Sequence, residues 1–407
     1  LESATVVLRD GLVEAVGTDV AVPKDARVID VKGLVLTPGF IDAFSGAGLP
    51  AAPARGAGGG GGGGGGGSAS APATGSLSPQ ALVIDKVRPA EALKARDSGV
   101  TTVLVVPREG VLPGRSVLLN LSGEKAESMV LKQPAALHLH LATLTRQYPG
   151  SLMGTVALAR QALLDGQRYR EEWAAYEKSP GGKKRPIYDS ALEAWAEVAA
   201  GRLPLWVTAT RENDVRRTLG LADEFKLKVA VLGAPQAFHA AALIKARKVP
   251  LVVSVNFDPP RATGGFFGGV DEEREKKDIE DAERNPAELH KAGVSFALGS
   301  GHAKDFLAGV RKAIEKGLPR EAALRAVTLS AAEALGVADR TGSLERGKVA
   351  NLVAWSGGDP LTKDAKAKLV FVDGQLYEPE ERPERKDGED KKPEGKPTDG
   401  GSGEVQP

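Results

Sequence analysis

The sequence contains no cysteine, and histidine is scarce, with five among 407 residues. The lack of cysteine excludes disulfides, thiolate metal sites and cysteine nucleophiles. It does not fix the compartment, because a cysteine-free chain tolerates both oxidising and reducing surroundings. The scarcity of histidine leaves few imidazoles for a metal site or for acid–base chemistry.

Aromatic residues, net charge and long apolar runs are also limited. Aromatics make up only 5% of the chain, which argues against base-stacking platforms. A formal net charge of +1 gives no electrostatic case for nucleic acid or an anionic membrane as a partner. No apolar run approaches the roughly 20 residues of a membrane span. We therefore expect no nucleic-acid partner and no membrane span.

Short apolar segments alternate with helical patterns from residue 82 to 338. Unbroken apolar strands separated by helices are typical of a parallel sheet covered on both faces. Eight such units over about 250 residues fit a (β/α)8 TIM-like barrel, in the α/β class. The expected strands are 34–41, 101–106, 116–121, 135–141, 204–209, 228–232, 250–255 and 294–299.

Strand patterns return at both ends of the chain. Turn residues Asp10-Gly11 and Asp373-Gly374 each separate two strand-like runs and predict hairpins. Residues 28–31 also have strand character. We expect segments 1–36 and 339–378 to form one small composite β-sandwich beside a barrel at 37–338.

Two segments have compositions that disfavour folding. Residues 51–81 include ten consecutive glycines, and residues 379–407 are charged and rich in proline. Neither can bury enough apolar surface to offset its ordering entropy. We expect a disordered insertion within the barrel at 51–81, with an interdomain linker as the alternative, and a disordered tail at 379–407.

Two helical segments have distinctive polar patterns. Ser330, Glu333 and Gly336 have the spacing of a capping box and a C-terminal glycine, which predicts a helix that starts at Ser330. The charged run 271–284 has i,i+4 pairs of opposite charge and predicts a solvated helix.

Four phrases carry a resemblance to a known family. They are residues 35–43 (VLTPGFIDA), 98–103 (SGVTTV), 342–353 (GSLERGKVANLV) and 371–374 (FVDG). With these phrases the chain resembles the amidohydrolase superfamily, most closely its imidazolonepropionase-like branch, over roughly residues 5–378. The resemblance implies a (β/α)8 barrel with a β-sandwich made from both chain ends. Relatives usually have a further strand before the point where this sequence begins, so the N-terminus looks clipped. A signal peptide could have been removed with it, which leaves both a cytoplasmic and a periplasmic location open.

The resemblance also implies one or two divalent metals at the carboxyl ends of the barrel strands, where a metal-bound water attacks a C–N or ester carbonyl. The residues at the family's ligand positions differ here. They are Phe44 and Gly46 in place of a His-x-His pair, Thr208 and Gly233 in place of two histidines, and Gly301 in place of an aspartate. We therefore expect no bound metal and no other cofactor.

Histidines elsewhere leave a second possibility open. His138 and His140 lie two residues apart in an expected strand, so their side chains share one face. With His302 they are fallback ligands for zinc or another divalent metal, completed by a carboxylate such as Asp305 or Asp258. The alternative for His138 and His140 is a place in the packed barrel interior.

Other polar residues near the expected mouth are weaker candidates. His302 is the candidate catalytic residue, and Thr208, Thr210 and Arg211 are candidate substrate-binding residues. The two remaining histidines, at 239 and 290, fall on helical patterns and are expected at the surface. Asp42 is expected to be a buried structural carboxylate.

Two functions follow from these patterns. The first is a metal-free, catalytically impaired amidohydrolase homologue. It would act as a scaffold, as the partner subunit of a ligand-complete paralogue, as a homo-oligomer, or as a binding module for a small ligand. The alternative is an active hydrolase of cyclic amide or peptide-like C–N bonds with a rearranged metal site.

Overall fold

The structure is a computed structural model of the chain, and it describes residues 3–50, 77–144, 147–257, 272–303 and 305–379. The predicted disorder at 51–81 and at 379–407 concerns residues that lie almost entirely outside this described part. In the described helices, none combines the length and apolarity needed to cross a membrane.

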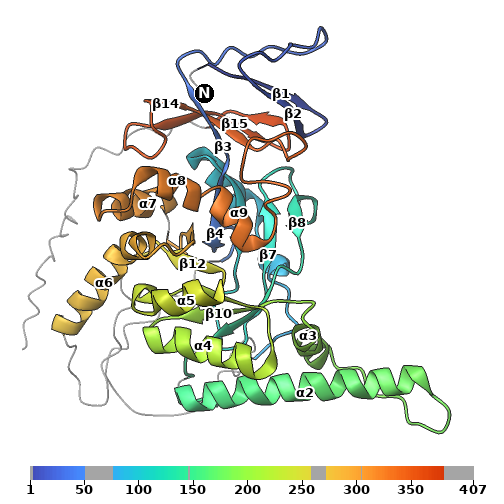
Figure 1. The fold of residues 1–407 in the computed structure, drawn as a ribbon. Helices are drawn as coiled ribbons and strands as arrows, with labels where there is room; N and C mark the ends of the chain where they lie inside the picture. The colour runs from blue at the N-terminus through green and yellow to red at the C-terminus, as the bar shows by residue number, and fades with distance from the viewer. Residues whose placement is uncertain (1–2, 51–76, 145–146, 258–271, 304, 380–407) are drawn as a thin grey trace, which may run out of the picture.

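The centre of the molecule is built from short buried parallel strands (Figure 1). Most of their side chains are inaccessible to solvent, as expected for strands covered on both faces. Each of these strands overlaps a segment that the sequence predicts as a barrel strand. They are β4 (Phe40–Ser45), β5 (Val100–Val105), β9 (Leu137–His140), β10 (Leu205–Ala209), β11 (Val229–Gly233), β12 (Leu251–Ser254) and β13 (Ala297–Gly299). The expected strand 34–41 is wrong in extent: only residues 40–41 lie in β4, and residues 35–38 belong to a different sheet.

These strands belong to two hydrogen-bonded sheets. Strands β9 to β13 run parallel in one sheet, in chain order. Strands β4 and β5 are parallel neighbours in the other. Within the described residues, hydrogen bonds between strands do not join the two sheets into a closed ring.

The prediction of a parallel strand at 116–121 is wrong. Here β7 (Val117–Asn120) runs antiparallel to β5 and to β8 (Val130–Lys132), and β6 (Gly114–Arg115) runs antiparallel to β9. Residues 106–116 join β5 to β6 and β7 without a helix. A parallel crossover needs a dozen or more residues and usually a helix, so this short connection favours an antiparallel return.

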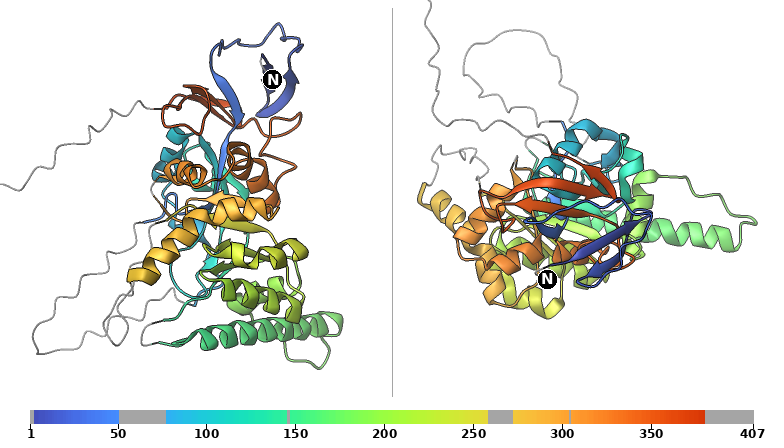
Figure 2. Two further views of the ribbon diagram at one scale, coloured as in Figure 1. Left: turned by 60° about the vertical axis from the view of Figure 1, so that its left-hand side comes forward. Right: turned by 90° about the horizontal axis from the view of Figure 1, so that it is seen from above.

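Helices cover the outside of the strands, and α2 extends well beyond the rest of the molecule (Figures 1 and 2). The helices that follow β9 are α2 (Leu152–Lys178), α3 (Ser190–Ala199), α4 (Glu212–Phe225), α5 (Ala241–Arg247), α6 (Glu272–Lys291), α7 (Phe306–Glu315), α8 (Arg320–Ala326) and α9 (Leu329–Leu335). Before β5 lie η1 (Val83–Lys86), α1 (Pro89–Leu93) and η2 (Lys94–Ser98); η3 (Ala126–Met129) precedes β8, and η4 (Ala237–Ala240) precedes α5.

Two helices differ in detail from the sequence prediction. Helix α9 has Thr328 as its N-cap, and Ser330 is buried inside the helix, so the predicted capping box is wrong. The predicted end at Gly336 is confirmed, because this residue adopts the left-handed conformation. Helix α6 forms from the charged run, but its Glu283 is buried and pairs with Lys312 and Lys316 of α7, so this helix is not solvated all round.

Segments from both ends of the chain share one sheet. Strand β3 (Val35–Pro38) pairs antiparallel with β14 (Leu352–Ser356). On its other side β14 pairs antiparallel with β15 (Lys366–Val372), which pairs antiparallel with β16 (Gln375–Tyr377). The predicted hairpins at Asp10-Gly11 and Asp373-Gly374 are both present, the first joining β1 (Thr5–Arg9) to β2 (Leu12–Gly17). Residues 28–31 form no strand, contrary to expectation. That the end segments constitute one composite domain stays a prediction.

A buried amide network connects this sheet to the barrel strands. The Asn351 amide donates to Asn120 Oδ1 at 2.6 Å, and Thr102 Oγ1 donates to the same oxygen at 3.1 Å. The Asn120 amide in turn donates to Asp373 Oδ1 at 2.6 Å. These bonds satisfy polar groups that would otherwise be buried without partners, at the junction between β5, β7 and the β15–β16 turn.

Candidate functional site at the barrel mouth

The residues predicted at the family's ligand positions lie together at the carboxyl ends of the strands. The Gly301 N–H, just after β13, donates to the Phe44 carbonyl at 2.9 Å. A Cβ atom placed on Gly233, at the end of β11, would lie 3.8 Å from Phe44 Cε1 and 3.7 Å from Thr208 Cγ2. Residues from four strands therefore meet at one place, the end where TIM-barrel enzymes carry their chemistry.

Neighbouring side chains fill the space beside the glycines. A Cβ on Gly46 would overlap the Arg108 guanidinium and lie 2.6 Å from His302 Nδ1. A Cβ on Gly301, which has φ +58°, would overlap the Ser254 hydroxyl. The Phe44 ring is buried and meets the His302 ring edge-on, with centroids 4.9 Å apart. Longer side chains at 46 and 301 would require these neighbours to move.

Arg108 fixes the tautomer of neutral His302. The Arg108 Nε–H donates to His302 Nδ1 at 3.2 Å, and its Nη2 donates to the Gly46 carbonyl at 3.3 Å. An arginine Nε–H can only donate, so Nδ1 must be the unprotonated nitrogen and neutral His302 carries its hydrogen on Nε2. The sequence analysis missed Arg108, although its place three residues after β5 is the available signal, because barrel strands present functional residues at their carboxyl ends.

All three histidines of the mouth are held neutral. Burial, with Arg108 and His140 nearby, lowers the pKa of His302 to about 3. Burial lowers the pKa of His140 to about 4, although its bond to the Gly110 backbone acts in the opposite direction. Burial, His140 and His302 lower the pKa of His138 well below its usual value. The three imidazoles are therefore neutral at pH 7 and close enough to influence one another.

Buried polar atoms lack partners deeper in the same region. Among the described residues, both ring nitrogens of His138, which is fully buried in β9, have no hydrogen-bond partner, and neither has Thr208 Oγ1. In the strand register His140 is opposite Thr208, and His138 is opposite Trp206, whose ring centroid lies 6.2 Å away. Such atoms normally bind a water or a ligand, since leaving them unsatisfied is costly.

The residues present do not fit a divalent metal at the family positions, because phenyl, hydroxyl and glycine groups supply no imidazole or carboxylate ligand. The fallback set is not assembled either. In the described part of the chain no group of three or more His, Asp or Glu side chains is arranged to hold a metal. Asp305 instead caps α7 by accepting from the Ala308 N–H at 2.9 Å. Asp258 lies outside the described residues.

Comparisons with known proteins agree with this architecture. The sequence model of the Amidohydrolase family matches residues 244–377. The solved structure of an amidohydrolase from Thermotoga maritima MSB8 superposes with a TM-score of 0.76 at 25% identity, covering 91% of this chain and 94% of that one. This chain is an amidohydrolase-family protein. Its fold is the family's (β/α)8 barrel, with the strands in two sheets as described above.

Two curated amidohydrolase-family relatives are also similar. Amidohydrolase tasK of Hapsidospora irregularis is 24% identical over 391 residues, which is 87% of this chain. The chain spans only 37% of the length of tasK. Imidazolonepropionase of Erwinia tasmaniensis is 48% identical over 60 residues, which is 15% of this chain and 14% of that enzyme. A prolidase structure superposes with a TM-score of 0.53 at 16% identity over 92% of this chain and 94% of its own, a likeness of fold alone.

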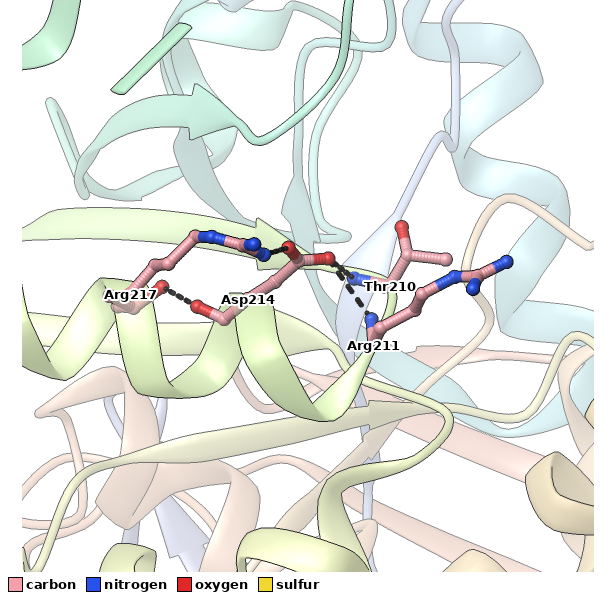
Figure 3. Close-up of polar contacts among 5 residues, drawn as sticks. Thr210, Arg211, Asp214 and Arg217 are labelled. Carbon is pink, nitrogen blue, oxygen red and sulfur yellow. Dashed lines mark hydrogen bonds and ion pairs between the residues drawn. The ribbon is translucent and has the colours of Figure 1, made fainter. Parts of the chain in front are cut away.

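Thr210 and Arg211 of this amidohydrolase-family protein lie in the loop between β10 and α4. Figure 3 shows both backbone N–H groups donating to the Asp214 carboxylate, at 3.2 and 3.1 Å, while the Arg211 side chain extends away from it. The other carboxylate oxygen accepts from Arg217 at 2.9 Å. Asp214 thus fixes the loop, and the side chains of Thr210 and Arg211 are exposed. Their role stays a prediction.

The remaining predicted residues lie as expected. The Asp42 carboxylate is buried and accepts from the Ser300 N–H at 2.7 Å and the Phe44 N–H at 3.2 Å. Burial raises the pKa of Asp42 despite these bonds. Its role is to join β4 to the residue after β13. His239 and His290 are exposed on the outer helical layer, as predicted.

Two hollows lie at the opposite ends of the strands. They have volumes of about 540 and 380 Å³ and share Lys248, Pro250 and Glu333 in their walls. The first lies where β10, β11 and β12 begin, and the second lies where β12 begins and just before β13; both are beside α9. We favour the mouth as the functional site, because it carries the neutral histidines and Arg108, whereas the amino ends of barrel strands usually serve stability.

Proposed function

We propose that this amidohydrolase-family protein is a pseudoenzyme for metal-dependent hydrolysis, and that it binds a small ligand at the barrel mouth or serves as a scaffold. One observation carries the proposal. The resemblance predicts Phe44, Gly46, Thr208, Gly233 and Gly301 at the positions where the family would hold its metal, and neighbouring side chains fill the space beside two of these glycines. Restoring a ligand side chain there would displace Arg108 or Ser254.

Metal content tests this proposal. The full chain, purified without chelator and without a histidine-rich tag, is analysed for zinc, iron, manganese and nickel, before and after incubation with zinc and gel filtration. We expect far less than one ion per chain in both samples. Close to one tightly held ion per chain would contradict the proposal.

A second function has one observation in its favour. His138 is buried with two unpartnered ring nitrogens, which suit a metal ligand as well as a buried water. The alternative is an active hydrolase of cyclic amide or peptide-like C–N bonds, with zinc or another divalent metal held by His138, His140 and His302. If an ion is found, the substitutions H138Q, H140Q and H302Q should each release it, whereas H290Q on the exposed face of α6 should not.

The scaffold role implies a partner subunit, either a ligand-complete paralogue or a second copy of this chain. Light scattering on the eluted full chain distinguishes a monomer from a homo-oligomer. A monomer that also fails to bind a co-expressed paralogue would remove the scaffold role and leave ligand binding.

A further inference from the structure

Arg108 is the permanent cation of the barrel mouth. Its guanidinium is partly buried, and burial lowers its pKa from the usual arginine value. It takes up the space into which a side chain at position 46 would project, the position of the second family histidine. A fixed positive charge thus lies at the end of the barrel where the family's metal would supply one.

Within the described part of the protein no carboxylate forms an ion pair with this cation, and burial alone accounts for its lowered pKa. The hydrogen bonds of its guanidinium go to a neutral imidazole and to a backbone carbonyl. The buried carboxyl near the mouth, Asp42, is engaged with the backbone of Phe44 and Ser300. A partly desolvated guanidinium without a carboxylate is expected to attract an anion, because charge-assisted hydrogen bonds are stronger than neutral ones.

The free donors around Arg108 match one kind of anion. Among the described residues, two of the five guanidinium N–H groups have partners, which leaves Nη1 and the second Nη2 hydrogen. Neutral His302 carries one further donor, its Nε2–H, because Arg108 occupies its Nδ1. A carboxylate can bind a guanidinium edge through two parallel bonds. A phosphate dianion would need more than this single cation.

We propose that Arg108 takes the place of the metal as the cation of the mouth, and that with His302 it binds the carboxylate of a small organic acid. The Phe44 ring, edge-on to His302, gives the site an apolar wall for the rest of that molecule. His138 lies one layer deeper than His140 and Thr208, and the unpartnered atoms of His138 and Thr208 are available to a water held beneath the ligand. This inference rests on the proposed ligand-binding function.

Binding of matched probes to the full chain tests the inference. N-acetylglycine supplies a carboxylate, N-acetylglycinamide is its uncharged analogue, and inorganic phosphate is the competing anion; affinities are measured by saturation-transfer NMR at pH 7 in low-chloride buffer. We expect N-acetylglycine to bind at least about tenfold more tightly than the amide or phosphate, about 1.4 kcal/mol. Equal binding of acid and amide, tighter binding of phosphate, or no binding of the acid would overturn the proposal.

Substitutions identify the residue responsible. R108Q should abolish the preference for the acid over the amide, and R108K should retain only part of it, because lysine lacks the planar fork. R216Q is the matched control, since Arg216 is exposed on α4 and paired with Glu212. Unfolding curves check that each variant is folded. A preference that survives R108Q in folded protein contradicts the assignment.

The metal analysis separates this inference from the proposed function. Absent metal with no carboxylate preference would reject the inference and leave the pseudoenzyme proposal. A bound metal with a preference that survives chelation and depends on Arg108 would reject the pseudoenzyme proposal and the replacement of the metal by Arg108, and would retain only Arg108 as the carboxylate-binding residue. A preference lost on chelation but retained in R108Q would reject both.

Discussion

Single residues decide what the mouth of this barrel can hold. Gly46 gives the Arg108 guanidinium the space it occupies, and the same guanidinium fixes the neutral form of His302. The absence of one side chain therefore sets the position of a charge and the orientation of a donor. The dependence of Arg108 on the space at Gly46 can be tested by adding a single methyl group at position 46.

G46A should destabilise the protein by about 1–3 kcal/mol, the usual range for overpacking, because the new Cβ overlaps Arg108. Urea unfolding measures this change. The double variant G46A/R108A should lose less than the sum of the single changes, since removing the guanidinium removes the severest overlap and leaves only the one with His302 Nδ1. G220A is the control, because no atom lies within 4 Å of the added carbon in helix α4. Additive effects would contradict the coupling.

Among the elements, the sheet of β3, β14, β15 and β16 depends on polar contacts with β5 and β7. Asn351, just before β14, donates to Asn120 and accepts from the Asp373 N–H at 3.1 Å. N351A should reduce the free energy of unfolding by about 1–3 kcal/mol, because the buried Asn120 and Asp373 groups lose a partner. The exposed N213A on α4 should change it by less than about 0.5 kcal/mol. Similar effects of N351A and N213A would argue against a stabilising network.

The strands and turns also show how much of the fold can be predicted from the sequence. Apolar runs predict the positions of β5 and β9 to β13, and Gly at a left-handed position predicts both end hairpins, because these signals are local. The run at 34–41 does not show where β3 of the end sheet stops and β4 of the barrel starts. The direction of β7 depends on the length of the connection before it, which the apolar pattern of 116–121 does not report. At the site, histidines draw attention by their rarity. Arg108 belongs to no recognisable sequence motif. Its importance to the site comes from its hydrogen bond to His302, 194 residues further along the chain, which the sequence does not reveal.

The whole molecule should lose stability in acid. The unfolded state takes up protons on His140 and His302 near their ordinary pKa of about 6.5, whereas the folded state resists protonation down to pKa values of about 4 and 3. The stabilisation is therefore complete above pH 6.5 and is lost as the pH falls towards 3. Each such histidine contributes a slope of about 1.4 kcal/mol per pH unit between its two pKa values.

Urea unfolding at pH 7, 6, 5 and 4.5 measures this slope. H302Q and H140Q should each flatten the profile, because glutamine does not titrate. The exposed H290Q should leave it unchanged. Parallel profiles for H302Q, H140Q and the unsubstituted protein would show that these histidines do not resist protonation.

The pairing of β3 with β14 determines when the end sheet can form during synthesis of the chain. Leu36 of β3 lies opposite Ala354. More than three hundred further residues must therefore leave the ribosome before β3 can pair with β14. Closing so long a loop is slow, and an open strand edge is a template for wrong partners. A chain halted before residue 352 would expose that edge, and we expect such stalled chains to aggregate and to need a chaperone until β14 emerges.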